Sequence, residues 1–172
     1  MKFTYFLAAS VALATVACDK DDEPVTQADI VGSWELSEYD ASTELDAQGT
    51  LTTSTTSLGD DYDAVIEFRD DNTYRQTGSV ELATEVVVNS ETYPPVTQTY
   101  DVTGTGTYEV NDGRLTGVVL SYEGEGQVID GDDAGYDLAL DGDRLIMTTA
   151  LEIPTVNEIA TEASLRLVYV RQ

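Results

Sequence analysis

The sequence predicts an all-β protein whose antiparallel strands follow one another and close into an up-and-down barrel. Short runs that alternate apolar and polar residues recur about every 8 to 15 residues after residue 24, and Asp, Asn and Gly bound these runs. The runs indicate about eight to ten strands, most of them linked as hairpins. Closure would remove the two edges that an open sheet exposes. A β-sandwich is the alternative, but it usually needs crossing connections.

The first strand is expected from Ile30 to Tyr39. Trp34, the only tryptophan of the chain, stands there two residues after Gly32. We expect the indole to plug one end of the closed sheet. The following stretch, 43–57, is mostly Thr and Ser and is polar on both faces. Such a pattern specifies strand register weakly, so it predicts a poorly specified strand pair or a mobile lip.

A hairpin is expected next. Ala64, Ile66 and Phe68 occupy alternate positions and therefore share one face of a strand. The residues 70–72, Asp-Asp-Asn, then have the chemistry of a turn, and the chain returns as a strand over 73–78. A further strand is expected over 80–88.

The segment around two consecutive prolines predicts a break in this regularity. Pro94 and Pro95 lack amide donors, so the segment 89–95 is expected to be a loop or a sheet edge. A long strand over 96–110 follows, and its two glycines, Gly104 and Gly106, are placed where a barrel strand bends to close.

The last third of the chain repeats the pattern of strand and turn. The remaining predicted elements are, in order, a turn at 111–113, a strand at 115–122, a Gly/Asp-rich segment at 124–135 with a short strand at 127–129, a hairpin of 136–140 with 145–149, a loop at 153–163 and a last strand at 165–171. In that last strand Leu165, Leu167 and Tyr169 share one face.

The first 17 residues have the composition of an export signal. Lys2 is their one charged residue, and the apolar stretch 3–16 is too short and Ala-rich for a permanent membrane-spanning helix. The sequence Thr15-Val16-Ala17-Cys18 resembles the lipobox of bacterial lipoproteins, which implies that Cys18 carries the lipid. The alternative is an ordinary signal peptide whose removal leaves Cys18 as a stray thiol.

Residues 18–28 predict an acidic tether between this anchor and a folded domain at 29–172. The run Asp19-Lys20-Asp21-Asp22-Glu23 resembles the export tag that sends some lipoproteins of Gram-negative bacteria to the outer face of the outer membrane. The resemblance implies an outer-membrane lipoprotein that is exposed at the cell surface or faces the periplasm. Its partner would be the membrane, held through acyl chains on Cys18.

The charge of the chain excludes several kinds of partner and site. The formal net charge is −25, and removal of the leader with Lys2 leaves 33 acidic residues against seven basic ones. Such a chain repels nucleic acid and anionic membrane surfaces, and it is expected to stay monomeric. The chain has no histidine and one cysteine, which excludes Cys/His zinc sites, Ser-His-Asp triads and disulfides within the chain.

Three features together resemble a known family. They are Gly32-Ser33-Trp34 in the first strand, the turns at 70–72, 111–113 and 141–143, and a last strand that ends Tyr169-Val170-Arg171. On these features, residues 29–172 resemble the lipocalin-like lipoproteins of bacteria. The resemblance implies that Gly32 and Trp34 lie at the closed end of a barrel and that an arginine packs across the indole. We expect Arg171 rather than Arg166 in this role.

A barrel with a cavity would have an apolar pocket above Trp34. Its candidate lining residues are Leu36, Phe68, Tyr108, Val110, Tyr136 and Leu138. The alternative is that these side chains simply fill the core of a small barrel, as apolar side chains usually do.

Two acidic clusters raise the question of a calcium site, because hard cations bind several oxygen ligands from one loop. Solvated turns explain both clusters better, so no metal and no cofactor is expected. The candidate ligands are Asp60, Asp61 and Asp63 in one cluster and Asp130, Asp132 and Asp133 in the other.

The expected function is the binding of a small lipophilic molecule by a lipid-anchored barrel, or an accessory role at the outer membrane. The alternative is a structural or protein-interaction module with a filled core and no ligand. A third possibility is a carboxylate-based enzyme on the same barrel, but no pair of carboxylates stands out in the sequence, and the protein is not expected to be an enzyme.

Overall fold

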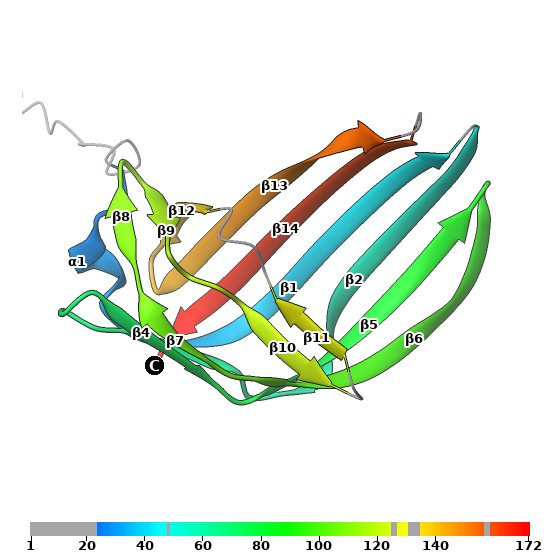
Figure 1. Ribbon diagram of the computed structural model, residues 1–172. Coiled ribbons are helices and arrows are strands. Elements are labelled where there is room, and N and C mark those ends of the chain that lie inside the picture. The colour runs from blue at the N-terminus through cyan, green and yellow to red at the C-terminus, as the bar shows by residue number, and fades with distance from the viewer. Residues whose placement is uncertain (1–23, 48, 125–126, 131–134, 157–158) are drawn as a thin grey trace, which may run out of the picture.

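The computed structural model describes residues 24–47, 49–124, 127–130, 135–156 and 159–172, and it shows an antiparallel all-β fold (Figure 1). The prediction of an antiparallel all-β fold is therefore confirmed. A short helix, α1 (Gln27–Ile30), precedes the first strand. The strands are β1 (Gly32–Ala47), β2 (Thr50–Tyr62), β3 (Val65–Phe68), β4 (Thr73–Thr77), β5 (Ser79–Val88), β6 (Glu91–Val102), β7 (Gly104–Thr107), β8 (Glu109–Asn111), β9 (Arg114–Thr116), β10 (Ser121–Gly124), β11 (Gln127–Asp130), β12 (Tyr136–Asp141), β13 (Arg144–Val156) and β14 (Ile159–Arg171).

The first and last strands of the domain pair with each other. β1 and β14 run antiparallel from the pair Trp34–Arg171 to the pair Ala47–Ile159. The full order of neighbours is β11-β10-β6-β5-β2-β1-β14-β13-β12-β9-β8, and β3, β4 and β7 branch from β1. Among the described residues, hydrogen bonds do not close this sheet on itself, because the path ends at β8 and β11.

The branch beside β1 divides the molecule into two regions. The first residues of β1, from Gly32 to Glu35, pair with β3, whereas Asp40 to Ala47 pair with β2. Between them lies a register shift of β1 against β14. We call the region around β3, β4, β7 and the start of β1 the narrow end. Beyond the shift, β6, β5, β2, β1, β14 and β13 lie side by side as antiparallel neighbours. We call this part of the sheet the long strands, and Figure 1 shows them fanning out together.

The narrow end holds most of the packed core. Trp34 is fully buried, and its indole Nε1 donates a hydrogen bond to the carbonyl oxygen of Ile30 at 2.7 Å. Phe68 and Tyr108 pack edge to face with ring centroids 4.9 Å apart. Other fully or nearly fully buried side chains of this cluster include Leu36, Ile66, Leu115, Leu120, Leu145, Met147 and Leu167. The core is therefore apolar and dense at this end.

Several predicted elements differ from the observed ones. Of the two alternatives for 43–57, the structure shows the strand pair and not the lip: the end of β1 pairs with the first part of β2 in continuous register from Asp40–Ser57 to Ala47–Thr50. The predicted loop at 153–163 is wrong: β13 extends to Val156 and β14 starts at Ile159. Both segments gain backbone hydrogen bonds from a neighbouring long strand, which side-chain pattern alone does not reveal.

The expected long strand at 96–110 is divided into three. β6 ends at Val102, β7 starts at Gly104 and pairs with β4, and β8 pairs with β9. Only Tyr108 separates β7 from β8. The expected strand 115–122 is likewise divided, into β9 and β10, and the described residues form fourteen strands, more than the expected eight to ten. The segment with Pro94 and Pro95 belongs to β6 and lies at the edge of the long strands.

Candidate functional site

The indole at the narrow end is covered by the arginine that sequence analysis favoured. The guanidinium carbon of Arg171 lies 4.1 Å from the centroid of the Trp34 ring, within the range of a cation–π contact. Arg171 also donates hydrogen bonds to the carbonyl oxygens of Val31, at 3.0 Å, and Asp29, at 2.7 Å. These three contacts join the end of the last strand to the start of the first.

The glycine beside this contact is required by geometry. Gly32 has φ +139°, a conformation that other residues rarely adopt. A Cβ at this position would lie 2.9 Å from Nη1 of Arg171, so a larger residue would push the guanidinium away. Arg166, the alternative, lies elsewhere: it donates to Glu38 at 2.6 Å and to Asp40 at 3.1 Å.

The six candidate pocket residues lie in or against the packed core. Leu36, Phe68, Tyr108 and Tyr136 are buried in it, and Val110 and Leu138 are half-buried beside it. The Tyr108 hydroxyl is already used, because it donates to the carbonyl oxygen of Arg69 at 2.8 Å. These residues therefore fill the narrow end. The outer surface beside them has a polar hollow of about 360 Å³, lined by Asn72, Thr107, Tyr108, Glu109, Thr116 and Gly117.

The long strands present a different kind of surface, which starts on β1 after the register shift. Every second residue there, from Tyr39 to Ala47, is half-buried and uncharged. The residues between them, Asp40, Ser42, Glu44 and Asp46, are exposed, and three of these four are acidic. Because the ring of Tyr39 contacts the core residue Tyr122 edge to face, the uncharged side is the inner one.

Cross-strand register extends this inner side over the neighbouring strands. On β2, Ser54 and Thr56 lie opposite Thr43 and Ala41. On β5, Thr84 lies opposite Thr56, and the two hydroxyl oxygens are 2.9 Å apart. We define the inner face of the long strands as Tyr39, Ala41, Thr43, Leu45, Thr52, Ser54, Thr56, Leu58, Leu82, Thr84, Val86, Val88, Ala163 and Leu165.

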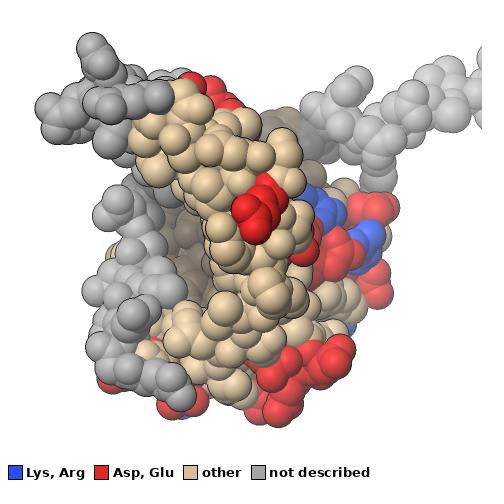
Figure 2. All heavy atoms as spheres, turned by 90° about the vertical axis from the view of Figure 1, so that its right-hand side faces the viewer, with Lys and Arg blue, Asp and Glu red and all other residues tan. Residues whose placement is uncertain are grey.

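On β1, β2, β5 and β14 this inner face contains no charged residue, in a chain with 33 acidic side chains, and Glu91, which pairs with Val88 at the tip of the edge strand β6, is the first charged residue beside it. Most of its members are half-buried rather than covered. Figure 2 looks at the molecule from this end and shows a hollow whose described border is uncharged, with most of the visible acidic residues on the outer side. Charge is therefore segregated between the two faces of the same strands.

Acidic residues on the outer side are partly neutralised by arginine. Glu38 accepts hydrogen bonds from both Arg144 and Arg166, and the bond from Arg166 is the main cause that lowers the pKa of Glu38. Val168 lies opposite Glu38 in the β1–β14 register and is fully buried although it is on the outer side of β14.

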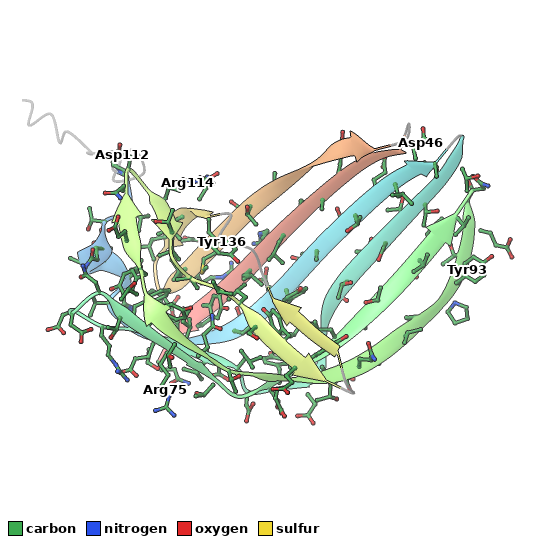
Figure 3. The ribbon with its side chains drawn as sticks, in the orientation of Figure 1. Asp46, Arg75, Tyr93, Asp112, Arg114 and Tyr136 are labelled. Atoms are coloured by element: carbon green, nitrogen blue, oxygen red, sulfur yellow. The ribbon has the colours of Figure 1, made fainter. Side chains whose placement is uncertain are left out.

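A group of tyrosines lies between the narrow end and the inner face. Burial raises the pKa values of Tyr39, Tyr122 and Tyr169, so these phenols stay neutral across the physiological range. Tyr136 and Tyr100 are also buried in this part of the core, and Figure 3 shows Tyr136 inside the fold behind β10. The transition from packed core to open surface is therefore aromatic and uncharged.

The carboxylates that were weighed as candidate calcium ligands do not form a cluster in the part of the chain that the structure describes. No group of three or more His, Cys, Asp or Glu residues there could hold a metal ion. Asp63 instead accepts hydrogen bonds from the amide and hydroxyl of Ser79, at 2.6 and 3.0 Å. Asp132, Asp133 and the side chain of Asp130 lie outside the described residues, as do the leader and Cys18.

Sequence analysis missed the two most informative features of the site. The inner face was missed because many of its residues are Thr and Ser, which a search for apolar alternation does not detect. The pattern that could have revealed it is the alternation of acidic residues, which occur at 40, 44 and 46 and not at 39, 41, 43 and 45. The second feature is Gln76 on β4, which is 2% exposed in the apolar core. Neighbouring residues of a strand point to opposite faces, so a charged and therefore outward Arg75 could have predicted that Gln76 points inward.

Comparison of the chain with protein-family models, curated proteins and solved structures found no match. Within the described ranges, no helix has the length and apolar character needed to span a membrane.

Proposed function

We propose that this protein is a lipocalin-like barrel lipoprotein of the outer membrane, anchored through Cys18, that binds a small neutral lipophilic molecule on the inner face of the long strands. The observation that carries the proposal is the absence of charge on that described face of a chain with formal net charge −25. If both faces of the long strands were exposed only to water, nothing would require the charged residues to be confined to one of them.

The barrel part of this proposal is supported by how the strands meet. β1 pairs with β14 along its whole length, and Arg171 covers the indole where the pairing starts. On the opposite side, β7 is joined to β4 and β8 to β9, with Tyr108 alone between them. The backbone runs from β7 through Tyr108 into β8, so it links the strands on the β4 side to those on the β9 side although no hydrogen bonds between strands do. A sandwich would leave the first and last strands in separate layers.

The electrostatics favour a neutral ligand. An anion would approach a strongly acidic protein and find no cation on the inner face. A cation would be drawn to the outer carboxylates, and moving it inward would leave it unpaired. A neutral molecule is neither repelled by the acidic protein nor left as an unpaired charge on the inner face. The mixture of hydroxyls and aliphatic groups on that face suits an amphiphile with a long apolar body.

Two adjacent threonines provide a matched test. Thr56 is half-buried on the inner face, whereas Thr55 is exposed on the outer side. With the neutral fluorescent lipophile N-phenyl-1-naphthylamine as probe, T56R is expected to weaken binding at least about tenfold, because it puts an unpaired cation into the site. T55R should bind the probe like the unmodified protein. Equal effects of the two variants, or no binding by the unmodified protein, would refute the proposed site.

A second candidate is an interaction module with a filled core. The packed narrow end and two exposed apolar residues on the edge strand β6, Tyr93 and Val96, favour it. Figure 3 shows Tyr93 at the outermost edge of the long strands. A protein of this second kind would bind no lipophile but would lose its partner when Tyr93 and Val96 are both replaced by Ser.

A further inference from the structure

The polar hollow on the outer surface of the narrow end lies where the sheet is split. β7 pairs with β4 and β8 pairs with β9, and Tyr108 alone joins β7 to β8. Figure 1 shows β8 continuing from β7 along one side of the molecule. The hollow is open to the surface, and its volume of about 360 Å³ is within the range of small-molecule pockets. Unlike the packed core beside it, it therefore offers space that a ligand can enter.

Backbone contacts fix the shape of the hollow on two sides. Gly117 has φ +83°, and a Cβ there would lie 2.5 Å from the carbonyl oxygen of Thr107, so only glycine lets these two segments come so close. Asn72 is in the turn before β4, and its carbonyl oxygen accepts from the amide of Tyr108 at 2.9 Å. The side-chain oxygen of Asn72 accepts from Nε2 of Gln27. Both the backbone and the carboxamide of Asn72 are thus held in place.

The polar groups that line the hollow have unused hydrogen-bonding capacity. Nδ2 of Asn72 and the hydroxyls of Thr107 and Thr116 have no hydrogen bond to any described residue. Glu109 accepts one long bond within the described ranges, from Nδ2 of Asn111 at 3.5 Å. Because these groups are exposed or half-buried, water can reach them, and a ligand would replace water rather than break bonds within the protein. The hollow presents an amide donor, a carboxylate acceptor and two hydroxyls that can act as either.

The charge around the hollow excludes an anionic ligand. In the part of the chain that the structure describes, Glu109 has no arginine partner. Burial raises the pKa of Tyr108, and the nearby carboxylates of Asp71 and Asp70 raise it further. A carboxylate or a phosphate would therefore meet a negative potential with no cation to pair with. An ammonium group would pair with Glu109, but it has no acceptor for Nδ2 of Asn72.

We propose that this hollow is a second binding site, for a neutral sugar unit. Every hydroxyl of a sugar both donates and accepts, so neighbouring hydroxyls can donate to Glu109 and accept from Asn72 at the same time. The bonds to Glu109 are the strongest of the set, because its charge assists them. The hydroxyls of Thr107 and Thr116 complement the rest of the sugar. The site shares no residue with the inner face of the long strands, so it does not depend on the proposed function.

Protein NMR tests the site with the methyl α-D-pyranosides of glucose, mannose and galactose as probes. At least one of them is expected to shift the amide signals of Thr107, Glu109 and Gly117, with a Kd of about 1 mM, as suits a small ligand. Glu109→Gln keeps the size of the side chain but removes its charge, so it should weaken binding at least about fivefold. The control is Asp112→Asn, which removes an exposed charge in the β8–β9 turn, outside the hollow, and should not change binding.

Two threonines of β7 provide a matched pair. Thr105 and Thr107 are both exposed and, being two residues apart, point to the same side of the strand, but only Thr107 lines the hollow. Thr107→Val should weaken binding of the glycoside at least about threefold, because one hydrogen bond is lost. Thr105→Val should bind it like the unmodified protein.

Three outcomes would overturn the sugar site. One is that none of the glycosides shifts these signals. Another is that Thr105→Val and Thr107→Val weaken binding equally. The third is that ethanolamine binds in place of the glycosides and is lost in Glu109→Gln, since the hollow would then be a cation site. T56R, which alters the inner face of the long strands, should leave glycoside binding unchanged, so failure of the lipophile site and failure of the sugar site are separate results.

Discussion

The narrow end and the long strands are built from the same two strands, β1 and β14, but they are held together differently. Trp34 and Leu36 are at most 1% exposed at the narrow end, where side chains from several strands interlock. Beyond the register shift the same strands have one half-buried and one exposed side. The narrow end is therefore stabilised by packing, and the long strands mainly by backbone hydrogen bonds.

The outer side of the long strands also carries unfavourable charge. Glu44 on β1 lies directly opposite Glu162 on β14, and both are exposed. At the level of Asp40 the same two strands instead carry the favourable contact with Arg166. The packed side chains are concentrated at one end, so we expect stability to be concentrated there and the proposed ligand site to lie at the less stable end.

The largest expected effect is at the indole. Trp34→Ala should lower the free energy of unfolding by about 3–5 kcal/mol, because it removes a fully buried ring and leaves a cavity. Leu45→Ala on the long strands is the matched comparison, and it should cost less than about 1.5 kcal/mol because Leu45 is only half-buried. Urea unfolding followed by circular dichroism measures both. Equal costs would remove the distinction between the two regions.

A smaller effect is expected at the arginine that covers the indole. Arg171→Met should lower the free energy of unfolding by about 1–3 kcal/mol, through loss of two hydrogen bonds to backbone carbonyls and the cation–π contact. The control is Arg69→Met, which breaks a pair with Glu67 in which both side chains are more than two-fifths exposed. Such a surface pair contributes little, so a loss at Arg69 as large as that at Arg171 would contradict the account.

The smallest effects concern the two outer glutamates, and they have opposite signs. The pKa of Glu38 is lowered in the folded state, so its contribution is present above its ordinary pKa and is lost as pH falls through the lowered value. Glu38→Gln should therefore lower stability at neutral pH, by less than about 1 kcal/mol for a pair this exposed, and have no effect at low pH.

Glu44→Gln should instead raise stability slightly at neutral pH, because it removes repulsion from Glu162. The gain should shrink as salt concentration rises. Thermal unfolding at two pH values and two salt concentrations measures both variants. A stabilising effect of Glu38→Gln would show that the arginine pairs do not bind as described.

The sequence predicted the fold where side-chain pattern decides it. Alternation placed Leu165, Leu167 and Tyr169 on one side of the last strand, and turn chemistry located the hairpins at 70–72 and 141–143. At 43–57 it left a strand pair and a lip open, and the structure shows the strand pair; at 153–163 it failed, because a regular strand pair is maintained there by long neighbours rather than by an apolar face. Pattern recognition looks for hydrophobic alternation, which both segments lack.

The candidate site was predicted only in part. The tryptophan near the start could be picked out because it is the only one in the chain, whereas its glycine and the arginine near the end were expected from the resemblance to the lipocalin-like lipoproteins. The six apolar pocket candidates could not be distinguished from core by type, and the structure places them in or against the core. Gln76 could not be singled out, because an unpaired buried amide is a property of its surroundings and not of its sequence position.

Amide hydrogen exchange, measured with and without a saturating neutral lipophile, tests the central claim most directly. The account predicts that the ligand slows exchange along β1 from Tyr39 to Ala47 and along β2 from Thr50 to Leu58, where the half-buried inner face becomes covered. If peptides from these two strands exchange at the same rate with and without the saturating ligand, the assignment of the ligand site to the long strands is contradicted.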